Sequence, residues 1–254
     1  MKLIWIGVVV ALAGPAAAKE IAGASYVEPT DAYGHGAVKG GEYTGLRIDY
    51  DDGTHNVIRF DGAVFEDTAP RLHDFDRDGT PEVVAVLSGF RVGAMVQVYD
   101  FDGEWARPIG NTNPIGQRHR WLAIAGIADF NGDGADDIAY VDRPHLARTL
   151  RIATVGMAGG AATLSPYASA DGLSNHLLGT PEIEGGVRVC DGAAPAVLTA
   201  NADWSRIMET VWDDGRLVST EVGAYAGPES FAPYLACACG RNGLAPGSIR
   251  GRGQ

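Results

Sequence analysis

The chain has 254 residues, of which 46% are hydrophobic and 20% are charged, a composition that fits one sizeable globular domain or two small ones. Its formal net charge of -12 excludes a basic face for contacts with nucleic-acid phosphates, so we expect no nucleic-acid partner. The 35 glycines and the lack of long apolar runs favour a turn-rich, all-β architecture.

Residues 1–18 are predicted to be a cleaved export signal. Lys2 precedes an apolar run over residues 3–13, and small residues follow at 16–18. This is the pattern of a secretory signal cut after Ala18, and the apolar run is too short to span a bilayer comfortably. A retained membrane anchor is the alternative. We therefore expect a secreted or periplasmic bacterial protein with no membrane span after cleavage.

Four segments have the pattern of hairpin arms, at nearly even spacing. In each, a β-like run of alternating apolar residues ends in Asp-Gly or a similar turn pair. They are LRIDYDDG (46–53), VQVYDFDG (96–103), LRIATVGMAG (150–159) and METVWDDG (208–215). These arms predict about four repeats of a few short strands each. DWSRIMETVW (203–212) is the most helix-like stretch, but its place in the repeat predicts a strand.

Two acidic loops precede apolar runs and repeat each other at an offset of about 55 residues, a period typical of a propeller blade. The first has Asp74, Asp76 and Asp78 at alternate positions, followed by Gly79 and Glu82; the second has Asp129, Asn131, Asp133, Gly134 and Asp137. A third copy, VRVCDGAAPAVLTA, keeps Asp191-Gly192 and the strand after it. It has Val187, Val189 and Pro195 at ligand positions, so it cannot hold a metal in the same way.

Clustered hard oxygen ligands suit a hard cation such as Ca²⁺. Alternation puts the first, third and fifth side chains on one side of a tight turn, and the glycine permits positive φ. Two Ca²⁺ sites are predicted, one formed by Asp74, Asp76, Asp78, Thr80 and Glu82, the other by Asp129, Asn131, Asp133, Ala135 and Asp137; Thr80 and Ala135 would supply carbonyls. An EF-hand is excluded because position twelve is Ala85 or Tyr140, where that motif needs Glu, and because strands flank the loops.

These two segments resemble the calcium loops of FG-GAP or VCBS-type repeats, which build β-propellers of the kind found at the N-terminus of integrin α chains. The resemblance implies the same two ligand sets and a small β-propeller over residues 19–235. Two features depart from the family: only two loops are intact, and about four repeats are fewer than the usual seven. The ring would be small, incomplete, completed by partner chains, or closed by pairing of residues 21–29 with the C-terminal repeat.

The three cysteines are Cys190, Cys237 and Cys239. Export permits disulfides, and an odd count leaves one thiol over. Pairing of Cys190 with either of the other two would tie the C-terminal segment onto the body of the protein. Residues 236–254 are predicted to be a flexible, cysteine-containing tail because they are polar and rich in glycine.

Other candidates for chemistry are few, and no catalytic residue is predicted. The six histidines (His35, His55, His73, His119, His145 and His176) show no metal-ligand spacing, and no nucleophile elbow or phosphate loop is present. Glu182 and Glu184 are either a carboxylate pair or solvated, and the solvated interpretation is favoured. Trp105, Trp121, Trp204 and Trp212 are expected between blades, with a stacking surface for sugar or peptide as the alternative.

Three classes of function stay open. The first is a binding module on a calcium-stiffened propeller, with an unidentified protein or glycan partner. The second is a carbohydrate-active lyase or hydrolase, and the third is a structural or assembly partner. The lack of a catalytic constellation favours a non-catalytic module. A deep pocket with convergent acids or histidines would instead favour the enzyme.

Overall fold

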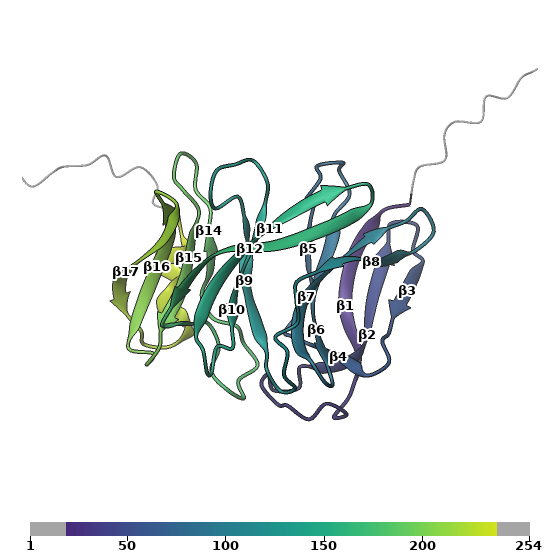
Figure 1. The fold of residues 1–254 in the computed structure, drawn as a ribbon, viewed down its shortest axis with the longest axis horizontal. Coiled ribbons are helices and arrows are strands. Elements are labelled where there is room, and N and C mark those ends of the chain that lie inside the picture. The colour runs from purple at the N-terminus through teal and green to yellow at the C-terminus, as the bar shows by residue number, and fades with distance from the viewer. Residues whose placement is uncertain (1–18, 238–254) are drawn as a thin grey trace, which may run out of the picture.

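The computed structural model describes residues 19–237, which form an all-β fold of three antiparallel sheets (Figure 1). The first sheet holds β1 (Ile21–Pro29), β2 (Glu42–Tyr50), β3 (His55–Ile58), β4 (Ala63–Glu66), β5 (Arg71–His73), β6 (Glu82–Gly89), β7 (Gly93–Phe101) and β8 (Ala106–Asn111). The second holds β9 (Leu122–Ala128), β10 (Asp137–Asp142), β11 (Thr149–Ala158) and β12 (Ala161–Asp171). The third holds β13 (Leu173–Ser174), β14 (Gly186–Arg188), β15 (Ala196–Asn201), β16 (Arg206–Asp213) and β17 (Arg216–Ala224). The predicted all-β class is confirmed.

Only two short helical segments follow the last strand in the described part of the chain. They are η1 (Pro228–Phe231) and α1 (Ala232–Leu235). No helix of the described residues combines the length and the hydropathy that a membrane crossing requires. The predicted export signal lies outside the described residues, as does the part of the predicted tail after Cys237.

All four predicted hairpin arms are formed. β2 pairs with β3, β7 with β8, β11 with β12 and β16 with β17, each antiparallel. In the third arm Gly159 and Gly160 both have positive φ (60° and 73°), which the tight turn needs. Most of segment 203–212 lies in β16, so the strand prediction is also confirmed there.

The four arms fall in three sheets, not four, because β4 joins the first two repeats. Tyr43 of β2 pairs with Phe65 of β4, and Phe65 in turn pairs with Leu87 of β6. The short segment AVFE (63–66) therefore makes one eight-stranded sheet out of two hairpin units.

Buried central strands stack the sheets in chain order. β6 is buried along its whole length: Val84 packs in a core shared with the second sheet, and Val83 packs in a core within the first. β10 is buried in the same way, with Ile138 toward the first sheet and Ala139 toward the third. Because side chains alternate between the faces of a strand, each apolar run after an acidic loop serves two cores. Figure 1 shows the resulting row of sheets, a propeller-like arrangement.

The N-terminal strand does not pair with the C-terminal repeat. β1 pairs with β2 from Ile21 to Pro29, and β17 pairs with β16. β1 and β17 lie at opposite ends of the row of sheets (Figure 1). The expected closure by these strands is therefore wrong: β1 is an edge strand of the first sheet, and β2 is its partner.

The predicted tryptophans take different positions. Trp121 is buried in the core between the first and second sheets. Trp212 of β16 meets Tyr167 of β12 edge to face, with ring centroids 5.3 Å apart. Trp204 packs on Tyr225 within the C-terminal part of the molecule. Only Trp121 and Trp212 therefore contribute to packing between sheets in the way expected; Trp105, 39% exposed, stacks beside Tyr50 in the first sheet.

Candidate metal centre

The first acidic loop connects β5 to β6 and gathers three carboxylates. One oxygen from each of Asp74, Asp76 and Asp78 lies within 4.8 Å of the other two. Oδ1 of Asp74 is buried and has no hydrogen-bond partner among the described residues. Leaving a buried polar atom unpaired costs about 1–3 kcal/mol, and more for a charged group. The residues present therefore fit a cation, which would satisfy this oxygen and neutralise the cluster.

The backbone of the loop turns as the glycine predicts. Gly79 has φ of 99°, and its N–H donates to Oδ2 of Asp74 over 3.0 Å. Arg77 also has positive φ, at 61°, although it carries a Cβ. A left-handed residue other than glycine is strained by about 1–2 kcal/mol. This left-handed residue turns the backbone so that the alternate aspartates lie on the same side of the loop.

Glu82 closes the loop from the first position of β6. It is almost fully buried, and its Oε2 accepts the N–H of Phe75 over 2.7 Å. Burial, together with the charges of Asp76 and Asp100, raises the pKa of the Glu82 carboxyl to about 7. A bound cation would favour the ionised form of Glu82. It would also pair with the negative charges of Asp76 and Asp100 that repel this carboxylate.

Asp100 is an acidic neighbour that the sequence reasoning missed. It lies on β7, where the pairing of Val83 with Tyr99 puts it next to Glu82. Burial raises its pKa, and the charges of Asp76 and Asp78 contribute. Asp100 is part of the arm VQVYDFDG, 22 residues after Asp78. Its position beside the acidic loop depends on the register of the strands and is not visible in the sequence.

The second acidic loop connects β9 to β10 and repeats this backbone. Gly132 and Gly134 have φ of 75° and 93°. Gly134 N–H donates to Oδ2 of Asp129 over 2.9 Å, as Gly79 does to Asp74 in the first loop. The seventh positions also match: the N–H groups of Thr80 and Ala135 each donate over 2.8 Å, to Oδ1 of Asp78 and of Asp133.

In contrast to the first loop, the polar side chains of the second loop already have hydrogen-bond partners within the protein. Nδ2 of Asn131 donates to Oδ2 of Asp133 over 2.9 Å, where the first loop has two carboxylates. Asp137 accepts three hydrogen bonds: from Thr154 Oγ1 over 2.7 Å, from the Tyr167 hydroxyl over 2.7 Å, and from a backbone N–H over 3.2 Å. The two predicted sites are therefore unequal, because Asp137 is already satisfied by protein donors.

The two acidic loops lie side by side although they belong to different sheets. Arg77 of the first loop donates from Nη2 to the carbonyl oxygen of Gly134 over 2.9 Å. His73, the last residue of β5, lies with Nε2 3.0 Å from Oδ2 of Asp136. A change in one loop therefore reaches the other directly.

The family model of an FG-GAP-like repeat matches residues 74–140. The chain carries an FG-GAP-like repeat. The match begins at Asp74, includes both acidic loops with β6 and the first four residues of β10, and confirms the resemblance drawn from those loops. No curated protein matches the chain.

Outside the FG-GAP-like repeat, the eroded third loop keeps the turn without the ligands. Gly192 has φ of 72°, and the predicted strand after it is β15. Cys190 in this loop forms a disulfide with Cys237, one of the two partners left open by the sequence. The disulfide ties the C-terminal segment to the loop before β15, while Cys239 lies outside the described residues.

Of Glu182 and Glu184, only Glu182 is exposed to solvent. Glu184 is buried, and its Oε2 accepts the hydroxyl of Tyr225 over 2.8 Å. Burial raises the pKa of Glu184. The solvated interpretation is therefore wrong for Glu184, because the C-terminal segment that covers it comes from 41 residues away in the chain.

Proposed function

We propose that this FG-GAP repeat protein is an exported, calcium-binding module of the small-propeller type, with about four blades and no catalytic role. Ca²⁺ at the acidic loops would stabilise the blades, which would present a surface to a protein or glycan partner. The observation that carries the proposal is the first loop, where three carboxylates converge and one of them, Asp74, has a buried Oδ1 with no hydrogen-bond partner among the described residues.

Ca²⁺ is the ion proposed because the ligands are all oxygens and flexible loops hold them. Ca²⁺ takes six to eight oxygen ligands in adaptable geometry, whereas Mg²⁺ demands a near-ideal octahedron. In the first loop Asp74, Asp76, Asp78 and Glu82 would bind the ion together with the carbonyl of Thr80. The ion would supply charge neutralisation and rigidity. The second loop would bind more weakly, since Asn131 replaces one charge and Asp137 is already hydrogen-bonded.

Export is supported by two independent features. The pattern of residues 1–18 is that of a secretory signal. The disulfide between Cys190 and Cys237 suits an oxidising compartment and is rare in the cytosol. N-terminal sequencing of the protein from an envelope or secreted fraction should begin at Lys19. A mature chain that still begins at Met1 would contradict export by cleavage.

A thermal unfolding series tests the calcium site. At ten times its dissociation constant, which for extracellular modules is on the order of 0.1–1 mM, Ca²⁺ adds about 1.4 kcal/mol per site. For a domain of this size that is a rise in melting temperature of roughly 3–6 °C per site. Calcium at millimolar concentration should produce this rise relative to excess chelator, and magnesium at the same concentration should produce less.

Asp76→Ala removes one ligand of the first loop and should abolish the larger part of the calcium-dependent rise. Asp61→Ala is the matched control, because Asp61 is an exposed aspartate that makes no side-chain hydrogen bond among the described residues. A wild-type melting curve that is the same in calcium and in chelator would sink the proposal. An Asp76→Ala variant with the full calcium response would remove the first loop as its site.

The second candidate is the carbohydrate-active enzyme, a lyase or hydrolase, and one observation favours it. His35, His119 and His145 line one cavity that lies apart from the acidic loops, with His176 directly behind His145. Incubation with a panel of neutral and uronic-acid polysaccharides would detect hydrolysis as new reducing ends and lyase action as unsaturated products. Turnover that is lost in His35→Gln would replace the non-catalytic module with the enzyme.

A further inference from the structure

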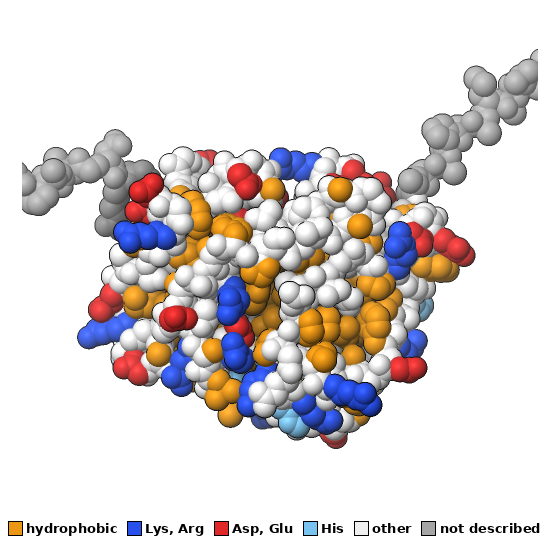
Figure 2. All heavy atoms as spheres, viewed as in Figure 1, with side chains coloured by type: hydrophobic (Ala, Val, Ile, Leu, Met, Phe, Trp, Pro, Cys, Tyr) orange, Lys and Arg blue, Asp and Glu red, His pale blue; other side chains and the backbone are white. Residues whose placement is uncertain are grey.

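Histidines that are scattered in the sequence meet at one cavity. The cavity has a volume of about 160 Å³, and His35, His119, Arg120, Trp121, His145 and Leu178 are among the residues that line it. The three histidines come from the β1–β2, β8–β9 and β10–β11 loops. None of these loops is an acidic loop, so the cavity is a separate place from the metal centre. Figure 2 shows histidine and basic side chains gathered at the lower edge of the view.

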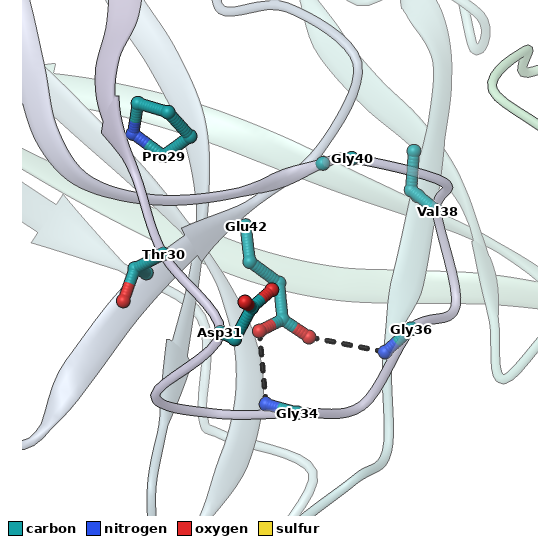
Figure 3. Close-up of a pocket in the computed structure, with 9 residues that line it drawn as sticks. Pro29, Thr30, Asp31, Gly34, Gly36, Val38, Gly40 and Glu42 are labelled. Atoms are coloured by element: carbon teal, nitrogen blue, oxygen red, sulfur yellow. Dashed lines mark hydrogen bonds between the residues drawn. The ribbon is translucent and has the colours of Figure 1, made fainter.

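His35 is held in place by a glycine-rich loop that closes around a carboxylate. The N–H groups of Gly34, His35 and Gly36 donate to the carboxylate of Glu42 over 2.9, 2.7 and 3.0 Å. Figure 3 shows the bonds from Gly34 and Gly36. Nδ1 of His35 then lies 2.6 Å from Oε1 of Glu66, which is fully buried. The imidazole is therefore fixed before any ligand arrives.

The floor of the cavity is a rigid aromatic cluster. Nε2 of His145 lies 2.9 Å from Nδ1 of His176, and Nε2 of His176 lies 3.2 Å from the carbonyl oxygen of Thr180. Burial lowers the pKa of both histidines to about 4, so both are neutral at neutral pH. The ring of Trp121 packs against both, and its indole N–H donates to the backbone oxygen of Glu66 over 2.6 Å.

Two arginines line this cavity, and one of them has no carboxylate partner. Arg143 is ion-paired with Asp142 over 2.8 Å, whereas Arg120 forms no ion pair within the described residues. Nine arginines of the described chain, Arg143 included, do form one. A guanidinium that lines a cavity and lacks a carboxylate partner can bind an anion that is not part of the protein.

The rim of the cavity is apolar. Leu146 is 61% exposed and Leu178 is 66% exposed, and both line the opening. Two exposed leucines at one opening mark a surface for an apolar group. A metal ion does not suit this cavity: among the described residues, the three ligand atoms that converge within 4.8 Å belong to Asp74, Asp76 and Asp78, not to these histidines.

We propose that this cavity binds a small organic acid, with its anionic group at Arg120 and an apolar or aromatic body against Leu146 and Leu178. The volume of about 160 Å³ is small for a ligand pocket and suits a body of about one ring. This inference does not depend on the calcium site, because the cavity is built by other loops.

The test is calorimetric titration of the mature protein with phenylacetate and with phenylacetamide, its uncharged analogue, in calcium-containing buffer at low salt. Phenylacetate should bind saturably at one site, and phenylacetamide at least about tenfold more weakly, since a hydrogen bond to a charged group is worth about 1.5–3 kcal/mol. Arg120→Gln should weaken phenylacetate binding about tenfold. Arg216→Gln, at an exposed arginine that forms no ion pair with any described residue, should leave it unchanged.

A second pair of variants tests the apolar rim. Leu178→Asp should weaken phenylacetate binding by repulsion and by loss of apolar contact, whereas Val189→Asp, at a side chain of similar exposure (61%) that does not line the cavity, should not. Absence of saturable heat up to about 10 mM phenylacetate overturns the proposal. So does equal affinity for the amide, or an Arg120→Gln variant that binds as the wild type does while both remain folded by circular dichroism.

Discussion

His176→Gln should change how the stability of the protein depends on pH. His176 is fully buried, and both of its ring nitrogens are used: Nε2 faces the Thr180 carbonyl, and Nδ1 faces Nε2 of His145. Protonation would turn Nδ1 from an acceptor into a donor and set it against the donor of His145. A glutamine offers one acceptor and one donor, but it does not take up a proton.

The sign follows from the lowered pKa. Burial lowers the pKa of His176 from its ordinary value of 6.5 to about 4. Between those values the unfolded chain binds more protons than the folded one, so the stability contribution is intact above pH 6.5 and is lost as the pH falls toward 4. A single ring with this shift would lose about 2 kcal/mol between pH 7.5 and pH 5. We expect about 1 kcal/mol, since His145 shares the penalty and partial solvation reduces it.

Urea denaturation at pH 7.5 and pH 5 measures this difference. The wild type should lose about 1 kcal/mol more than His176→Gln between the two values. The stability cost of the substitution itself cancels, because it is present at both pH values. The titration of carboxyl groups also cancels, because the wild type and the variant share these groups. His55→Gln is the control, because His55 is exposed. Equal pH dependence in the wild type and in His176→Gln would refute the reasoning.

Two further predictions concern contacts that stabilise the packed sheets and the C-terminal segment. Gly110→Ala should destabilise the protein by about 1–3 kcal/mol in urea, because a Cβ there would lie 2.0 Å from the carbonyl oxygen of Ala162 in the neighbouring sheet; Gly156→Ala, with its nearest atom at 4.0 Å, should cost less than about 1 kcal/mol. Removing both Cys190 and Cys237 should cost about 4 kcal/mol for a closed loop of 47 residues, and a reductant should lower the melting temperature of the wild type but not of the double variant. An unchanged wild-type curve in reductant would contradict the second.

The sequence predicted those parts of the fold that local patterns determine. Each hairpin arm carries its alternation and its turn pair within about ten residues, and each acidic loop carries its ligands within nine, so no distant contact is needed to find them. β4 was missed because AVFE is four residues long and its effect, joining two repeats, depends on pairing with β2 and β6 at once.

The candidate sites also differ in how far the sequence could predict them, because some depend on local patterns and others on contacts between distant segments. The first metal loop is local, but Asp100 joins it only through the register of β7 against β6. The histidine cavity has no local signature at all, since His35, His119 and His145 come from three loops that meet when the sheets stack. Spacing rules for metal or catalytic histidines describe neighbours on one element, and here each loop contributes a single histidine.

Comparison of the three related loops indicates what the proposed ion would do. All three keep the positive-φ glycine, at Gly79, Gly134 and Gly192, and all three lead into the buried central strand of a sheet. The requirement common to them is therefore the turn that delivers this strand into two cores. The first loop holds the turn with a carboxylate cluster, the second with internal hydrogen bonds, and the third with the disulfide at Cys190. In this interpretation the proposed ion would be one of three alternative ways to hold the same turn, and chelation should loosen the first sheet while the third stays closed.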